Sequence, residues 1–291
     1  MKPSAFAYHD PETIDEAVTL KSAHGSDATV LAGGLSLMPF IYARVHRPEV
    51  LVDINRVTEM QQVVVAGDHV EIGAGVRQRT AETDGGVRTA VPILTEAISY
   101  IGHAEIRHRG TVGGSIAFAD PATELPTVAV TLGAQMVVAG PSGVRTLPAE
   151  EFFVGQKINA LEPDEVLVAT RWPVPGGSHG YVEVSRRVGD RPMAAAACQL
   201  ELADDGTVAA AAIGVGNIAD RPLRASAAEQ LLVGSEPTAE LVTEAARTVR
   251  DQVTNGDDIH ATHDYRKHVA ATITARAITA ALHRGARGET A

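Results

Sequence analysis

The sequence has little of what several large protein classes require. Its single cysteine, Cys198, excludes an intrachain disulfide and any four-cysteine iron–sulfur site within the 291 residues. Lys and Arg number 25 against 36 Asp and Glu, giving a formal charge of −11, and no basic cluster offsets this excess. Because such a surface repels a phosphate backbone, we expect no nucleic-acid partner.

Long apolar runs are also missing. No stretch of about eighteen apolar residues is unbroken, and residues 1–9 hold no long apolar core. These features predict a cytoplasmic protein without an integral membrane segment. A content of 45% hydrophobic residues is still enough to bury two or three modest cores. Cys198 lies in the apolar stretch 193–202, which predicts a buried structural thiol.

The first part of the chain alternates helical and extended patterns. Asp10-Pro11-Glu12 has the form of a helix start with Asp10 as its cap, and helical spacing continues to Gly25. Further elements are predicted as a strand at 29–31, a helix at 37–45 and a strand at 49–54. This segment is predicted to be a small α/β unit.

A second unit opens with a hairpin, because the β-branched runs 63–66 and 69–72 flank Gly67-Asp68. A glycine-interrupted stretch, 102–121, lies between two predicted helices, and residues 111–115 within it are interpreted as a loop. The remaining predicted elements are helices at 92–100 and 124–132 and strands at 135–139, 144–147 and 166–172.

The composition changes at the Pro- and Gly-rich segment 173–178, which has the character of a linker. Beyond it, strands are predicted at 181–188, 192–202 and 207–215, and helices at 226–232, 238–249 and 261–283. We therefore expect three parts: residues 1–57, residues 58–175, and an antiparallel α+β domain at 178–285.

Two segments share a glycine pair followed within two residues by serine: Ala32-Gly33-Gly34-Leu35-Ser36 and Thr111-Val112-Gly113-Gly114-Ser115. Adjacent glycines permit positive φ and remove the Cβ atoms that keep a ligand from the backbone, so successive N–H groups can converge on an anion. Ser36 could also cap the helix that follows it. Such pairs can equally serve as tight turns, but two of them could hold a pyrophosphate from both sides.

Familiar nucleotide motifs are missing. No glycine-Lys-Ser/Thr phosphate loop exists, and Gly73-Ala74-Gly75 is followed by Gln78 where a dinucleotide fingerprint has its third glycine. Asp120-Pro121 closely follows the second segment. Asp120 is interpreted either as a helix cap or as a hydrogen-bond partner of a ligand's ribose or polar arm.

At these residues the chain resembles the FAD-binding subunits of the xanthine dehydrogenase and carbon monoxide dehydrogenase group. The motifs that carry the resemblance extend over nearly the whole chain. They are Ala32 to Pro39, Leu51 to Asn55, Ile106 to Ser115, Ala119 to Ala122, Phe152 to Gly155, Ser185-Arg186-Arg187 and Asp264-Tyr265-Arg266.

The resemblance implies an α+β chain: a two-part FAD-binding fold of the vanillyl-alcohol oxidase (PCMH) type, followed by the smaller antiparallel domain. It places Leu167 near the flavin ring. Tyr265-Arg266-Lys267 is interpreted first as a helix face, and the resemblance adds a docking surface as an alternative. His108 stands where the family often has Asn, and Glu183 where it often has a basic residue, which bears on the flavin's redox environment. The implied FAD contacts are Ala32, Gly33, Gly34, Leu35, Ser36, Thr111, Val112, Gly113, Gly114, Ser115, Asp120 and Leu167.

The resemblance also implies an electron-transfer role. A large molybdopterin subunit would oxidise the substrate, a small subunit would carry two [2Fe-2S] clusters, and this chain's FAD would pass electrons on within a dimer of heterotrimers. The sequence itself shows no nucleophile–base arrangement, and its 11 histidines lack a zinc-hydrolase spacing, so we assign no catalytic or metal-binding residue.

Three other hypotheses remain at this point. A self-contained flavin oxidase would need a substrate domain and an acid–base group above the flavin, and the C-terminal region is small for that. An assembly subunit that has lost its cofactor would not need intact glycine pairs. An α/β protein whose glycines only turn the chain would bind no flavin.

Overall fold

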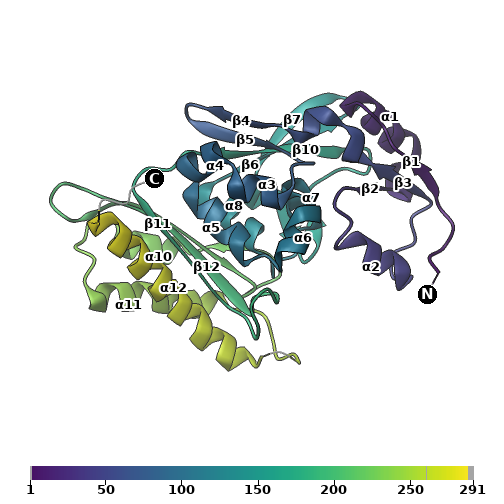
Figure 1. Cartoon of the computed structure of the whole chain (residues 1–291). Coiled ribbons are helices and arrows are strands. Elements are labelled where there is room, and N and C mark those ends of the chain that lie inside the picture. The colour runs from purple at the N-terminus through teal and green to yellow at the C-terminus, as the bar shows by residue number, and fades with distance from the viewer. Residues whose placement is uncertain (1, 260, 288–291) are drawn as a thin grey trace.

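A computed structural model describes residues 2–259 and 261–287, and its elements form three successive groups (Figure 1). The first group consists of strands β1 (Ala7–His9), β2 (Ala28–Leu31) and β3 (Val50–Asp53) and helices α1 (Ile14–His24) and α2 (Leu37–Tyr42). The three strands are parallel in the order β1-β3-β2. This is the small α/β unit expected from the alternating pattern.

Helix α1 begins three residues later than its expected start. Its N-cap is Thr13, whose hydroxyl accepts a hydrogen bond from the Glu16 N–H at 3.2 Å. Thr13 and Glu16 have the spacing of a capping box, which outcompetes the Asp-Pro signal. Asp10 instead pairs with Arg56 at 2.9 Å, so its assignment as the helix cap was wrong.

The second group is built on a five-stranded sheet. Its strands are β4 (Val63–Ala66), β5 (His69–Gly73), β6 (Gln135–Gly140), β7 (Gly143–Pro148) and β10 (Val166–Pro173). They are antiparallel in the order β4-β5-β10-β6-β7. The remaining elements are α3 (Gln78–Thr83), α4 (Gly85–Ala90), α5 (Pro92–Tyr100), α6 (Ala104–Arg109), α7 (Val112–Phe118), α8 (Glu124–Leu132), α9 (Ala149–Phe152), β8 (Phe153–Gly155) and β9 (Ile158–Asn159).

The glycine-interrupted stretch 102–121, for which no helix was predicted, contains α6 and α7. The second glycine segment is the first turn of α7, and Thr111 is its N-cap, because the Thr111 hydroxyl accepts from the Gly114 N–H at 2.9 Å. Packing explains why a glycine-containing sequence is helical here. Val112 and Ile116 are fully buried on one side of this turn, so tertiary contacts override the low helix propensity of glycine.

The third group follows the linker, with β10 ending at Pro173 and β11 beginning at Ser178. Its elements are β11 (Ser178–Val184), β12 (Ala194–Leu202), β13 (Val208–Gly216), β14 (Leu223–Arg224), α10 (Ser226–Leu232), α11 (Ala239–Thr248) and α12 (His263–Ala286). The strands are antiparallel in that order, and α12 packs along β11 and β12 (Figure 1). Cys198 on β12 is fully buried, as predicted, and burial raises the pKa of its thiol to about 12.

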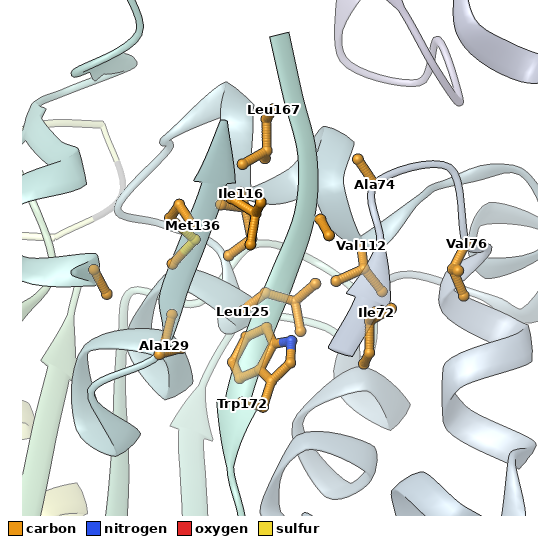
Figure 2. Close-up of a cluster of buried hydrophobic side chains, with 14 of the residues drawn as sticks. Ile72, Ala74, Val76, Val112, Ile116, Leu125, Ala129, Met136, Leu167 and Trp172 are labelled. Carbon is orange, nitrogen blue, oxygen red and sulfur yellow. The ribbon is translucent and has the colours of Figure 1, made fainter. Parts of the chain in front are cut away.

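Helix α8 joins the second and third groups. It packs against α5 and β10 within its own group and against β12 and β13 of the next. The approach to β13 is close, since a Cβ on Gly214 would lie 2.1 Å from the Thr131 Oγ1. Figure 2 shows part of the core beside this helix, where Leu125 and Ala129 of α8 lie among Ile116, Met136 and Trp172.

Leu167 belongs to the same core, on β10 (Figure 2). Leu167 pairs with Val138 of β6, beside a register shift between Leu167 and Ala169. None of the helices within the described residues is long and apolar enough to cross a membrane.

Candidate cofactor site

A cavity of about 610 Å³ lies between the first and second groups of elements. Both glycine segments contribute to its wall, although more than seventy residues separate them in the chain. Other wall residues come from α2, the end of α7 and the start of β10. The cavity is therefore the place where two distant parts of the sequence meet.

The first glycine segment is an open bend that offers backbone donors. Gly34 has φ +76°, a left-handed conformation that glycine adopts without strain. Among the described residues, no protein group accepts a hydrogen bond from the N–H groups of Gly33, Gly34, Leu35 or Ser36. Ser36 occupies the N-cap position of α2, but its side chain makes no capping hydrogen bond there, so its expected capping role was wrong.

Two polar side chains hold this bend against the chain that precedes the second segment. The Asn55 side-chain amide donates to the Ala32 carbonyl at 2.9 Å and accepts from the Arg77 guanidinium at 2.7 Å. Arg77 in turn donates to the Arg109 carbonyl at 2.6 Å. The approach is so close that a Cβ on Gly33 would lie 2.4 Å from that same carbonyl oxygen. The missing Cβ of Gly33 is thus a packing requirement.

The second segment has the same pattern of a glycine pair followed by serine, but most of its N–H groups are already hydrogen-bonded. The Gly113 N–H donates to the Ala74 carbonyl at 3.2 Å, the Gly114 N–H to Thr111 Oγ1, and the Ser115 N–H to the Thr111 carbonyl at 3.2 Å. The expectation that successive N–H groups of this segment converge on an anion was therefore wrong. Gly113 is instead required by packing, since its Cβ would lie 2.3 Å from that of Ala74.

Ten of the twelve residues predicted to contact FAD line the cavity. They are Ala32, Gly33, Gly34, Leu35, Ser36, Thr111, Gly113, Gly114, Ser115 and Leu167. The two exceptions are Val112, which is fully buried in the core, and Asp120.

Asp120 is 2% exposed, yet it caps no helix, because the N-cap of α8 is Thr123. Its carboxylate accepts from the Ala122 N–H at 3.1 Å and from the Arg191 guanidinium at 2.7 Å. The ammonium of Lys157 lies 3.6 Å from the same carboxylate. The helix-cap interpretation of Asp120 was therefore wrong, and contact with a ligand stays a prediction.

Two cavity residues were missed by the sequence analysis. Gln78 is 5% exposed, and its Oε1 has no hydrogen-bond partner among the described residues. Lys157 sits in the turn between β8 and β9, with its ammonium 5.8 Å and 6.0 Å from the ring centres of Phe118 and Phe40. A lone glutamine or lysine outside a motif carries no sequence signal for a site, so only the fold reveals them.

The other ionisable groups in the wall are already bound. Arg145 donates to both carboxylate oxygens of Glu165, at 2.6 and 2.7 Å, and this contact holds the pKa of Glu165 below its usual range. His46 hydrogen-bonds to the Thr29 hydroxyl at 2.8 Å. Neither group is placed as a free general base.

Buried acids gather where α8 meets the third group. Burial raises the pKa of Glu124 to about 8, and repulsion from Glu183 adds to the shift. Burial also raises the pKa of Glu183 to about 7, although the Tyr181 hydroxyl donates to it at 2.9 Å. Glu124 is therefore mostly protonated at pH 7. His108, the other departure noted above, is exposed on α6 and does not line the cavity.

Tyr265-Arg266-Lys267 does not present all three side chains to solvent. Arg266 is 3% exposed, donates to the Met193 carbonyl at 3.1 Å and pairs with Asp258 at 2.6 Å. Arg266 ties α12 to the chain around it and is not available to a docking face, whereas docking by its neighbours Tyr265 and Lys267 stays a prediction.

The donor set of the cavity suits FAD. Among the described residues, four unpaired N–H groups at 33–36 match the anionic oxygens of a pyrophosphate. Apolar residues such as Leu167, Phe40 and Phe118 provide surface for the rings.

Comparisons with known proteins agree with this geometry. Residues 4–175 match the family model described as the FAD binding domain in molybdopterin dehydrogenase, and residues 179–281 match the CO dehydrogenase flavoprotein C-terminal domain. The caffeine dehydrogenase subunit beta of Pseudomonas sp. (strain CBB1) is 37% identical, over 98% of this chain and 97% of the relative.

Solved structures are equally similar. Carbon monoxide dehydrogenase from Hydrogenophaga pseudoflava matches with a TM-score of 0.95 at 37% identity, over 98% of this chain and 100% of the matched chain. Quinoline 2-oxidoreductase from Pseudomonas putida 86 matches with a TM-score of 0.94 at 34% identity, over 98% and 99%. The expected α+β fold is confirmed, with an FAD-binding part followed by a C-terminal flavoprotein domain. The chain belongs to the family of FAD-binding subunits of molybdenum-containing dehydrogenases, and its cofactor is FAD.

Proposed function

We propose that this chain is the electron-transfer subunit of a molybdenum hydroxylase complex. Electrons would come from the [2Fe-2S] clusters of a small partner subunit, after a large molybdopterin subunit has oxidised the substrate. Bound FAD supplies the redox chemistry, and an external acceptor takes the electrons. The contacts with FAD are proposed for the ten predicted residues that line the cavity.

The observation that carries this proposal is the meeting of the two glycine segments at one cavity. A Cβ on Gly114 would lie 3.6 Å from that of Ala32, which measures how near the segments come. The first segment would bind the pyrophosphate through its free N–H groups. The second would contribute the surface of α7 and the hydroxyl of Ser115. The protein's part is thus to bind, orient and shield the cofactor.

The cysteine count and the ionisable residues of the cavity wall favour an electron-transfer role over oxidation of an organic substrate by this chain itself. Cys198 is the only cysteine, so no iron–sulfur cluster with four cysteine ligands can form within this chain. In the cavity wall, Glu165 is neutralised by Arg145 and His46 is bound to Thr29. A self-contained oxidase would need a free acid–base group beside the flavin, and neither residue is one.

Cofactor binding is tested first, with the isolated chain. The wild-type protein should purify yellow, with a flavin absorption spectrum and about one FAD per chain. The double variant Gly33→Val/Gly114→Val should purify colourless, because both side chains would enter the space between the segments. A wild-type chain that neither retains nor rebinds FAD would refute the proposal, as would a double variant with its full flavin content.

Electron transfer is tested with partner subunits. The chain is co-expressed with candidate large and small subunits from the same organism, and the purified complex is mixed anaerobically with substrate. Flavin absorbance near its visible maximum should bleach only when both partners are present. Reduction of the isolated flavoprotein by an organic substrate would instead favour the self-contained oxidase.

A further inference from the structure

Lys157 is the one Lys or Arg among the described residues that line the cavity. It occupies the tight turn between β8 and β9 with φ +59°, a left-handed conformation unusual for a residue with a side chain. Its N–H donates to the carbonyl of Ala119 at 2.9 Å, and Ala119 is itself left-handed, with φ +49°. Left-handed backbone is unfavourable for residues other than glycine. Two such residues in contact therefore indicate that the surrounding structure holds this turn in place.

The ammonium of Lys157 is held loosely by its neighbours. It lies 3.6 Å from the Asp120 carboxylate and about 6 Å from the ring centres of Phe40 and Phe118, which also line the cavity. Cation–π attraction fixes the direction of the charge without consuming a hydrogen-bond donor. Among the described residues no group accepts a hydrogen bond from this ammonium, so its donors can bind another acceptor.

Asp120 is the anchor of a group of three charges. Its carboxylate is 2% exposed and is bound more tightly by Arg191, at 2.7 Å, than by Lys157. Arg191 comes from the loop between β11 and β12, and its side chain is 54% exposed. One negative and two positive charges leave the group with a net charge of +1, and Lys157 is the member that reaches the cavity. Asp120 itself does not line it.

We propose that Lys157 supplies a cationic contact to an anionic oxygen of FAD, and that Asp120 is a positioning residue which acts through Lys157 without touching the cofactor. This proposal deepens the proposed function and rests on it for the identity of the ligand. It replaces the expectation that Asp120 binds a ribose or polar arm directly. Anionic oxygens occur on the pyrophosphate and on the reduced flavin ring, and both are candidates.

The test is a double-mutant cycle on FAD affinity, measured by titrating the deflavinated full-length chain. Lys157→Met should raise the Kd about ten-fold, as expected for the loss of one charge-assisted contact. The rise is expected for oxidised and reduced FAD if the contact is with the pyrophosphate, and for reduced FAD alone if it is with the ring. Asp120→Asn should raise the Kd about three-fold in the wild-type background and not at all in the Lys157→Met background. This non-additivity distinguishes a residue that acts through Lys157 from one that binds FAD itself.

Two variants serve as controls. Lys267→Met makes the same change of charge on α12, away from the cavity, and should leave the Kd unchanged. Lys157→Arg keeps the cation and should restore most of the affinity. Methionine tolerates the left-handed turn no worse than lysine does, and thermal melts of the apoproteins check that each variant is folded.

The source of the anionic oxygen is resolved by two further measurements. Contact with the pyrophosphate predicts that Lys157→Met weakens ADP binding by the same factor as FAD binding. Contact with the reduced ring predicts a lower flavin midpoint potential and unchanged ADP binding. Either result supports the proposal.

Three results would overturn it. The first is a Lys157→Met variant that binds both oxidised and reduced FAD like Lys267→Met, and the second is an Asp120→Asn effect of equal size in both backgrounds. Each of these leaves the proposed function intact, because wild-type chain still binds FAD. The third is a wild-type chain that binds no FAD, which refutes the proposed function and this proposal together.

Discussion

The two glycine segments share a sequence pattern and differ in almost everything their backbones do. The first, 32–36, is an open bend whose N–H groups have no protein acceptor among the described residues. The second, 111–115, is a helix cap and first turn whose N–H groups at 113–115 are all bound within the protein. One segment offers donors to a ligand, and the other offers a surface.

The difference shows that a glycine pair does not specify one conformation. Only Gly34 of the four glycines has positive φ. Gly33, Gly113 and Gly114 are there because a Cβ would come within 3 Å of a neighbouring atom. The first segment thus combines both uses of glycine, while the second uses only close approach.

Replacement of Gly113 should have the largest effect on stability. The Cβ of Gly113→Ala would lie 2.3 Å and 2.4 Å from the Cβ and Cα of Ala74. Neither atom belongs to a flexible side chain, so only a shift of the backbone can relieve the clash. We expect the free energy of unfolding to fall by about 3 kcal/mol. Urea denaturation of the cofactor-free chain measures it. A loss below about 1 kcal/mol would show that the second segment is no more tightly packed than an ordinary turn.

Replacement of Gly33 should lower the unfolding free energy less than replacement of Gly113, but it should weaken FAD binding strongly. In Gly33→Ala the new Cβ would lie 2.4 Å from the Arg109 carbonyl oxygen, and the open bend can relieve the clash by shifting. We expect a loss of about 2 kcal/mol in unfolding free energy. Because a shift displaces the free N–H groups, the Kd for FAD should rise by at least about thirty-fold. An unchanged Kd with lowered stability would mean that the first segment does not bind the cofactor.

Much of this architecture could be predicted from the sequence. Strands such as 63–66 and 166–172 were found because β-branched residues and turn signals act locally. Helix α7 was missed because its stability comes from Val112 and Ile116 packing into the core, a non-local effect that overrides glycine. The start of α1 was missed because two capping signals compete and only one wins.

The candidate site was predictable to the extent that it lies in motifs. The two glycine segments were identified from their sequence pattern. The different roles of their N–H groups depend on distant partners such as Ala74, which no local pattern reveals. Gln78 and Lys157 carry no motif. They become part of a site only when the fold brings α3 and the β8–β9 turn to one cavity.

Replacement of Gly34 tests the one glycine of the two pairs that has a left-handed backbone conformation. At φ +76° an alanine is strained, and its Cβ would lie 3.2 Å from the Met38 side chain and 3.3 Å from that of Leu31. We expect Gly34→Ala to lower the unfolding free energy by about 1.5 kcal/mol. The matched variant is Gly34→Asn, which tolerates left-handed backbone better and should lose less. Equal losses in urea denaturation would indicate that crowding, and not φ, requires glycine here.

The smallest effects on stability should come from replacing Ser36 and Thr111, the hydroxyl residues at the N-cap positions of α2 and α7. Thr111 caps α7 through its bond from the Gly114 N–H, whereas Ser36 makes no capping bond to α2. Thr111→Ala should therefore lower the unfolding free energy of the apoprotein by about 1 kcal/mol, and Ser36→Ala should leave it within about 0.3 kcal/mol of wild type. For FAD binding we expect the reverse order, because Ser36 has its hydroxyl and N–H available at the cavity wall while the Thr111 hydroxyl is already an acceptor within the helix. Urea denaturation and FAD titration of the same two variants measure both quantities. If Ser36→Ala destabilised the apoprotein as much as Thr111→Ala, the two segments would share a structural role after all, and the contrast between a donor-bearing bend and a packed helical turn would fail.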